Sequence, residues 1–156
     1  MSKAVTNVLF AGIGGQGIIL ASDLLSEMAF RCGFDVKKSE IHGMSQRGGS
    51  VSGDVRFGEK VYSPMIPAGE ADYLVAVSDD QIEVCRPYLS EKTVIIRPSD
   101  ISEADAKSRM LNIALLGVLN RYLKFDVELW KTLLRENFPA AVAEANIEVF
   151  LRAIGE

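Results

Sequence analysis

Residues that bind metals are scarce in this chain of 156 residues. It contains two cysteines, Cys32 and Cys85, and a single histidine, His42. The cysteines form no C-x-x-C pair and cannot hold an iron–sulfur cluster alone, and one histidine needs several more strong ligands to build a zinc site. The sequence therefore predicts no metal site on this chain alone, and two reduced thiols in or near the core.

Long apolar runs and an excess of positive charge are also missing. No apolar run approaches the roughly 20 residues that span a bilayer. The N-terminus leads from Met1 straight into a strand-like segment, which leaves no room for a signal peptide. The formal net charge is −4, and there is no basic stripe to bind nucleic acid. We therefore expect a cytoplasmic protein that binds neither a membrane nor nucleic acid.

The composition is that of a globular protein, with 48% hydrophobic and 24% charged residues. A chain of this length buries roughly 70% of the surface that its unfolded form exposes. We found no internal repeat and no low-complexity segment. The sequence predicts a single domain over residues 1–156.

The first forty residues have the pattern of a strand, a helix and a second strand. Residues 5–11 are almost continuously apolar, which indicates a buried strand. Apolar residues then recur at helical spacing from Ile18 to Met28, Gly33 is a plausible helix end, and residues 34–39 predict a weaker strand. A β-α-β pattern this short is typical of a parallel crossover unit.

The rest of the chain predicts further strands followed by helices. Alternation over residues 51–57, with Gly58-Glu59 as a turn, predicts a β-hairpin whose second strand is 60–63. Ser78 and Gln81 match a helix capping box. Other expected elements are strands 73–77 and 93–97, a helix to about Arg86, a loop or loose helical turn over 98–108, and helices 110–124, 127–137 and 140–153. We expect an α/β fold: a Rossmann-like, doubly wound, mostly parallel sheet with an inserted β-hairpin and C-terminal helices.

A glycine loop lies between the first strand and the first helix. Gly12, Gly14 and Gly17 satisfy G-x-G-x-x-G, the fingerprint of dinucleotide-binding folds, in which a phosphate rests on the helix N-terminus. That fingerprint also requires an acid at the end of the second strand. Asp35 comes too early and Glu40 slightly late. Two interpretations stay open: a dinucleotide site, and a tight turn that serves packing or a protein interface.

A second polar loop should lie beside the first, at the carboxyl ends of the strands, where open α/β sheets bind ligands. Arg47 offers a planar fork of donors for a carboxylate or phosphate, and the neighbouring glycines allow close backbone approach. The alternative is a solvated surface loop. No nucleophile and base stand together, so we assign no catalytic residue. The ligand or interface candidates of the two loops are Gly12, Gly14, Gly15, Gln16, Gly17, Ser45, Gln46, Arg47, Gly48, Gly49 and Ser50.

Five segments together resemble a known family. They are GIGGQG at 12–17, HGMSQRGGSVSGDVR at 42–56, ADYLVAVS at 71–78, NIALLGVLNRYL at 112–123 and ANIEVFLRAIG at 145–155. They are similar to the gamma subunit of 2-oxoacid:ferredoxin oxidoreductases. The HGMSQRGG form most resembles the small subunit of the indolepyruvate-type enzymes.

The resemblance implies an accessory subunit of a heteromeric oxidoreductase, inactive when isolated. Such enzymes decarboxylate a 2-oxoacid oxidatively to an acyl-CoA and reduce ferredoxin. Thiamine diphosphate, Mg²⁺ and iron–sulfur clusters would be bound by thiamine-binding and ferredoxin-like partner subunits, and coenzyme A would accept the acyl group. The resemblance leaves open which 2-oxoacid is used. The alternative functions are a stand-alone module that binds NAD(P) or FAD, and a structural interaction domain.

Overall fold

The computed structural model describes residues 4–14, 17–42 and 49–155. These residues form one five-stranded sheet with the order β2-β3-β1-β4-β5. β1 is parallel to β4, and β4 is parallel to β5, whereas β3 is antiparallel to both β1 and β2. All strands except β3 therefore run in the same direction. The strands are β1 (Val5–Ile13), β2 (Asp35–His42), β3 (Ser50–Gly58), β4 (Tyr73–Ala76) and β5 (Val94–Ile96).

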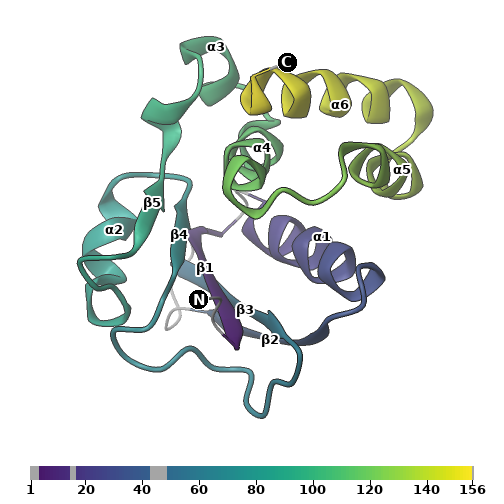
Figure 1. Ribbon diagram of the computed structural model, residues 1–156. Coiled ribbons are helices and arrows are strands. Elements are labelled where there is room, and N and C mark those ends of the chain that lie inside the picture. Colours follow the sequence, from purple (N-terminus) through teal and green to yellow (C-terminus); the bar gives the residue numbers. More distant parts are fainter. Residues whose placement is uncertain (1–3, 15–16, 43–48, 156) are drawn as a thin grey trace.

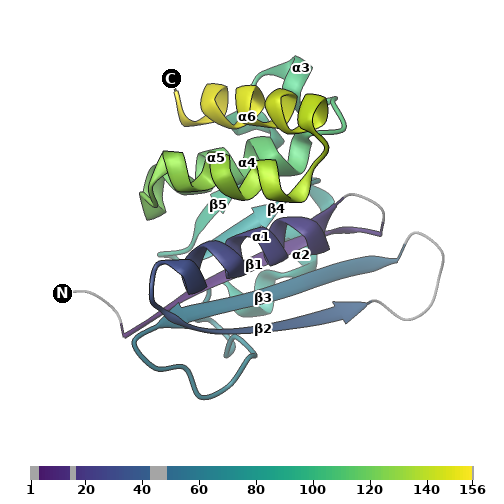
Figure 2. The same ribbon diagram turned by 90° about the vertical axis from the view of Figure 1, so that its right-hand side faces the viewer.

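Helices cover both faces of this sheet (Figures 1 and 2). α1 (Ile18–Arg31), α4 (Leu111–Leu123), α5 (Val127–Asn137) and α6 (Ala140–Ile154) form a thick layer on one face. α2 (Asp80–Val84) lies against the other face and continues into the short helix η1 (Arg86–Tyr88). The connection between β5 and α4 contains η2 (Pro98–Asp100) and α3 (Glu103–Ala106). This arrangement confirms the predicted doubly wound α/β architecture with C-terminal helices.

Two hydrophobic cores result from the alternation of side chains along β1. Val8 and Phe10 point into the core shared with α1, α4 and α6, while Leu9 and Ala11 belong to the core beneath α2. Successive side chains of a strand point to opposite faces, so a nearly continuous apolar strand supplies both. Each of these four side chains is at most 2% exposed. The predicted buried strand is therefore the centre of the molecule.

In the described ranges, no helix is long and apolar enough to cross a bilayer.

The hairpin lies at a different place from the predicted one. Its strands are β2 and β3, paired from Asp35 opposite Gly58 to His42 opposite Val51, and residues 60–63 form no strand. The reason is that β3 has β1 on one edge and β2 on the other, which leaves no free edge for residues 60–63. The following segment is held by a side chain instead, since Val61 N donates to Asp35 Oδ2 at 2.8 Å. The predicted β-α-β unit is consequently split by β3.

The predicted capping box of α2 is also wrong. The Ser78 hydroxyl donates to Asp80 Oδ1 at 2.7 Å, and the helix starts after Asp79 without a side-chain cap. By contrast, Asp126 caps α5 as predicted and accepts a hydrogen bond from Glu128 N at 3.0 Å. The start of the long, strongly periodic helix α5 was therefore predicted correctly from its capping residue, whereas the capping motif predicted for the short helix α2 was not formed.

α4 and α6 approach each other closely at Gly117. A Cβ added at this glycine would lie 2.7 Å from Cβ of Ala153 and 2.7 Å from the carbonyl oxygen of Phe150. Such distances leave no room for a methyl group, so glycine is required by the packing of the two helices.

We predict that Gly117→Ala lowers the free energy of unfolding by about 1–3 kcal/mol, the usual cost of overpacking a core. Chemical denaturation would measure the change. Adding Ala153→Gly should restore part of the loss, because it removes one of the two contacts. At a solvent-exposed helical site the same substitution would stabilise by about 1 kcal/mol, so a gain in stability would show that the helices are not packed this closely.

Candidate functional site

The two glycine loops meet at one end of the sheet, where β1 ends and β3 begins. Gly12 pairs with Val51 and Ile13 with Ser50 across the two strands. Beyond this pair, Gly14 N donates to the carbonyl oxygen of Gly49 at 3.1 Å. The structure thus brings together the described candidates of both loops, as the topology of open α/β sheets led us to expect. Their role in binding stays a prediction.

Six of the eleven candidates lie outside the described residues. They are Gly15, Gln16, Ser45, Gln46, Arg47 and Gly48. Their assignment as ligand or interface residues remains a prediction from the sequence.

Gly17 determines where α1 begins. It is the N-cap residue and adopts a left-handed conformation with φ 75°, which glycine tolerates far better than other residues. Its carbonyl oxygen accepts bonds from Ala21 N, at 3.1 Å, and from Nδ2 of Asn112, also at 3.1 Å. The Asn112 Oδ1 accepts from Ile113 N at 2.9 Å. The loop is therefore anchored to the first turn of α4.

Asn112 is a residue that the sequence reasoning missed. It is only 7% exposed, and it stands at the start of the apolar run of α4, where a polar side chain has to find a partner. A lone asparagine in this position was the available signal, but nothing in the sequence indicated that its partner is 95 residues away.

A cavity of about 240 Å³ lies beside the glycine loop. Its walls are mostly apolar, and His42 is the ionisable residue that lines it; the other lining residues are Ile13, Gly14, Gly17, Ile18, Ile19, Leu20 and Val51. The first turn of α1 carries no acidic residue. The unpaired N–H groups and the positive dipole end of this helix therefore face the loop without a competing carboxylate.

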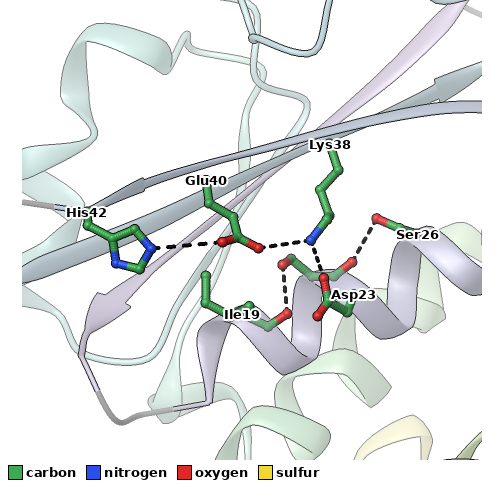
Figure 3. A network of polar contacts seen from close by, with 7 residues as sticks. Ile19, Asp23, Ser26, Lys38, Glu40 and His42 are labelled. Carbon is green, nitrogen blue, oxygen red and sulfur yellow. Dashed lines mark hydrogen bonds and ion pairs between the residues drawn. The ribbon is translucent and has the colours of Figure 1, made fainter.

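A chain of charged groups leads from α1 to His42 (Figure 3). Lys38 Nζ is paired with Asp23 Oδ1 and, at 2.9 Å, with Glu40 Oε2. The other Glu40 oxygen lies 3.8 Å from Nε2 of His42. The hydrogen bond from Lys38 is the main reason that the pKa of Glu40 is lowered from its ordinary value. Glu40 thus pairs with Lys38 through one oxygen, and its other oxygen lies opposite the imidazole of His42.

Neither acid considered for a ribose contact is free for that role. Glu40 belongs to the pair with Lys38, and Asp35 lies at the opposite end of β2, where it accepts from Val61 N. The backbone bond from Val61 is also the main cause that lowers the pKa of Asp35. The acid that the dinucleotide fingerprint requires is therefore not provided by these two residues.

We predict that Gly17→Ala destabilises the protein more than Gly33→Ala. Both glycines have positive φ, but a Cβ at Gly33 would meet nothing within 4 Å, whereas one at Gly17 would lie 2.4 Å from Nδ2 of Asn112. Backbone strain alone should cost Gly33→Ala about 1 kcal/mol, and the added clash should bring the loss for Gly17→Ala to roughly 2–4 kcal/mol. Denaturant unfolding of the two variants measures the difference. Equal losses would mean that Asn112 does not confine the loop.

Comparisons with known proteins agree on one family. The family model described as pyruvate ferredoxin/flavodoxin oxidoreductase matches residues 7–103, more than half of the chain. The indolepyruvate oxidoreductase subunit IorB of Thermococcus kodakarensis is 50% identical over 80 residues, which are 51% of this chain and 39% of that protein. The corresponding subunit of Methanothermobacter thermautotrophicus is 44% identical over 90 residues, 58% of this chain and 45% of that protein. The matched part spans less than half of these relatives.

Two solved structures share the fold. The gamma subunit of a keto/oxoacid ferredoxin oxidoreductase from Geobacter sulfurreducens superposes with a TM-score of 0.78 at 19% identity, over 97% of this chain and 95% of that one. A 2-oxoglutarate:ferredoxin oxidoreductase from Magnetococcus marinus, with 2-oxoglutarate, coenzyme A and succinyl-CoA bound, gives 0.81 at 20% identity, over 97% of this chain and 31% of that one. The family match over residues 7–103, which includes both glycine loops, shows that the chain belongs to the pyruvate ferredoxin/flavodoxin oxidoreductase family.

Proposed function

We propose that the chain is the gamma-type accessory subunit of a thiamine diphosphate-dependent 2-oxoacid:ferredoxin oxidoreductase. The complex would convert a 2-oxoacid and coenzyme A to an acyl-CoA and CO₂, and would pass the electrons to ferredoxin. The observation that carries the proposal is the family match over residues 7–103, which covers both glycine loops and the strands that join them. The 44–50% identity to indolepyruvate oxidoreductase subunits favours an arylpyruvate as the 2-oxoacid.

In this proposal, partner subunits bind thiamine diphosphate, Mg²⁺ and the iron–sulfur clusters. The two thiols of this chain are too few to hold a cluster alone. Burial raises the pKa of the Cys85 thiol to about 11, and burial also raises the pKa of Cys32. Cys85 lies in the core, whereas Cys32 is exposed at the surface after α1.

The glycine loops would form the face that this chain presents to the thiamine-bearing subunit and to coenzyme A. The fold requires glycine at position 17, because the residue has a positive φ and a side chain there would clash with Asn112. Gly14 is different: it lacks a positive φ, and an added Cβ would meet its nearest neighbours among the described residues at an ordinary 3.9 Å. Since none of these residues requires glycine there, its missing side chain supports close approach of a ligand or a partner.

An anionic group of coenzyme A suits this place on electrostatic grounds. The first N–H groups of α1 lack partners within the helix, and no acid stands in its first turn. Arg47, in the adjoining loop, would contribute a guanidinium that binds a phosphate or carboxylate through two parallel hydrogen bonds.

Isolation of the native protein tests the assignment as a subunit. We expect it to co-purify with a thiamine-binding subunit and a ferredoxin-like subunit, and the complex to reduce ferredoxin in the presence of a 2-oxoacid and coenzyme A. A lone monomer in the cell extract would contradict the proposal. Micromolar binding of NAD, NADP or FAD to the purified chain, measured by calorimetry, would favour a stand-alone nucleotide-binding module instead.

Replacement of Arg47 tests the ligand contact within the assembled complex. If its guanidinium binds coenzyme A or the substrate carboxylate, Arg47→Ala should lower kcat/KM by about tenfold or more, the usual effect of losing a charge-assisted hydrogen bond. Arg86→Ala is the matched control, because Arg86 is an exposed arginine paired with Glu83 on α2. Unchanged kinetics in the Arg47 variant would remove this residue from the site and favour a purely structural role of the loop.

A further inference from the structure

A second cavity, of about 260 Å³, lies on the opposite face of the sheet, between the strands and α2. In Figure 1 this helix stands on the far side of the sheet from α1 and α4. Gly14 and Gly17 line only the other cavity, whereas Ser50 and Val51, at the start of β3, line this one. The function proposed above makes no use of it.

The floor of the cavity includes the small side chains of Ala11 and Ser52. Ser52 on β3 lies between Ala11 of β1 and Ile41 of β2 in the sheet register. The roof comes from Gln81, Val84 and Cys85, which share one face of α2 at helical spacing. Protein interiors are normally packed to the density of organic crystals. This hollow is open at its edge, where the lining residues Val84 and Ile41 are exposed, so a small molecule can enter it.

Two mostly buried polar side chains, those of Gln81 and Asp54, line this hollow. Gln81 is 5% exposed and Asp54 is 4% exposed. Asp54 Oδ2 accepts a hydrogen bond from Ile66 N at 2.9 Å. Within the part of the chain that the structure describes, the side-chain amide of Gln81 and the Oδ1 atom of Asp54 have no hydrogen bond. Leaving such groups unpaired is costly, so they are expected to bind something that enters the cavity.

The described lining of the cavity favours an uncharged occupant. Among the lining residues that the structure describes there is no lysine, arginine or histidine, so an anion would face the Asp54 carboxylate without compensation from them. Arg56, next on the same face of β3, is already engaged, since it donates to Asn7 Oδ1 and to the carbonyl oxygen of Ser63, both at 2.8 Å. A metal cation would find the single carboxylate of Asp54 among walls formed largely by Leu9, Val84 and other apolar groups, and the described residues contain no group of three or more metal ligands.

We propose that this cavity binds an uncharged heteroaromatic compound of one or two rings that carries both an N–H donor and a ring-nitrogen acceptor. The N–H donates to the free oxygen of Asp54, and the acceptor receives a hydrogen bond from the Gln81 amide. The apolar walls contact the ring faces. A volume below that of typical drug-sized sites limits the occupant to one or two rings.

Benzimidazole is a suitable probe, because it is uncharged at mildly alkaline pH and has one N–H donor and one ring acceptor. We expect it to bind the full chain in calorimetric titrations and to shift the amide NMR signals of Ser52 and Gln81. Its N-methyl derivative lacks the donor and should bind about tenfold more weakly, which corresponds to the loss of one hydrogen bond to a charged or polar partner.

Three variants decide whether binding occurs in this cavity. Ser52→Leu fills the floor and should abolish binding of both compounds. Asp54→Asn keeps the shape and an acceptor for Ile66 N, and it should remove the difference between benzimidazole and its N-methyl derivative. Asp80→Asn, an exposed position on the same helix outside the cavity lining, should leave both affinities unchanged.

Two results would overturn the proposal. The first is equal affinity of benzimidazole and its N-methyl derivative for the unmodified chain. The second is the absence of any shift at Ser52 and Gln81 up to the solubility limit of the probe, which would show that the cavity holds water only; a space of this size accommodates several water molecules. Because the Asp54→Asn variant keeps the packing, the outcome does not depend on whether Ser52→Leu folds.

Discussion

β3 pairs with β1 along nine residues, from Val5 opposite Gly58 to Ile13 opposite Ser50. The pairing extends beyond the strands through the bond from Gly14 N to the Gly49 oxygen, so the two glycine loops are joined by the same ladder. It also blocks the edge of β1 on which β2 would otherwise pair, and so sends β2 to the far side of β3. The sheet topology and the position of the candidate site therefore have one cause.

The two faces of this pairing are packed very differently. On the side of α1 the strands contribute large apolar groups such as Phe10, Val55 and Phe57, each at most 4% exposed. On the side of α2 the same strands contribute Ala11, Ser52 and Asp54. Burial of large apolar side chains stabilises a fold by about 1.5–3 kcal/mol each. The first face therefore supplies most of the stability, and the second face is free to carry polar groups and a cavity.

The elements with long, regular patterns could be predicted from the sequence. The bounds of α1, α4, α5 and α6 follow from apolar periodicity, which is strong over more than ten residues. The hairpin partner could not be predicted in the same way, because residues 35–42 and residues 60–63 both have local patterns that allow a strand, and only the occupied edges of β3 decide between them. The choice is made by tertiary pairing, and a local pattern contains no information about it.

The candidate site likewise has features that could be predicted from the sequence and features that could not. The meeting of Gly14 and Gly49 follows from a general rule about the carboxyl ends of strands, so it could be anticipated. The anchoring of Gly17 by Asn112 could not, because it depends on how α4 is docked. Likewise, the sequence already placed Asp35 too early and Glu40 slightly late for a ribose contact, but the partners that these acids have in the structure, Val61 N and Lys38, could not be predicted.

The two cavities lie on opposite faces of the sheet, yet Val51 lines both of them. This residue stands at the start of β3, next to the loop, and is 8% exposed. A substitution at Val51 would thus disturb the glycine-loop cavity and the α2 cavity together, and its effect on activity could not be assigned to either. Ser52, one position along the strand, lines the α2 cavity alone. The alternation of side chains in β3 is therefore what allows the two sites to be varied independently.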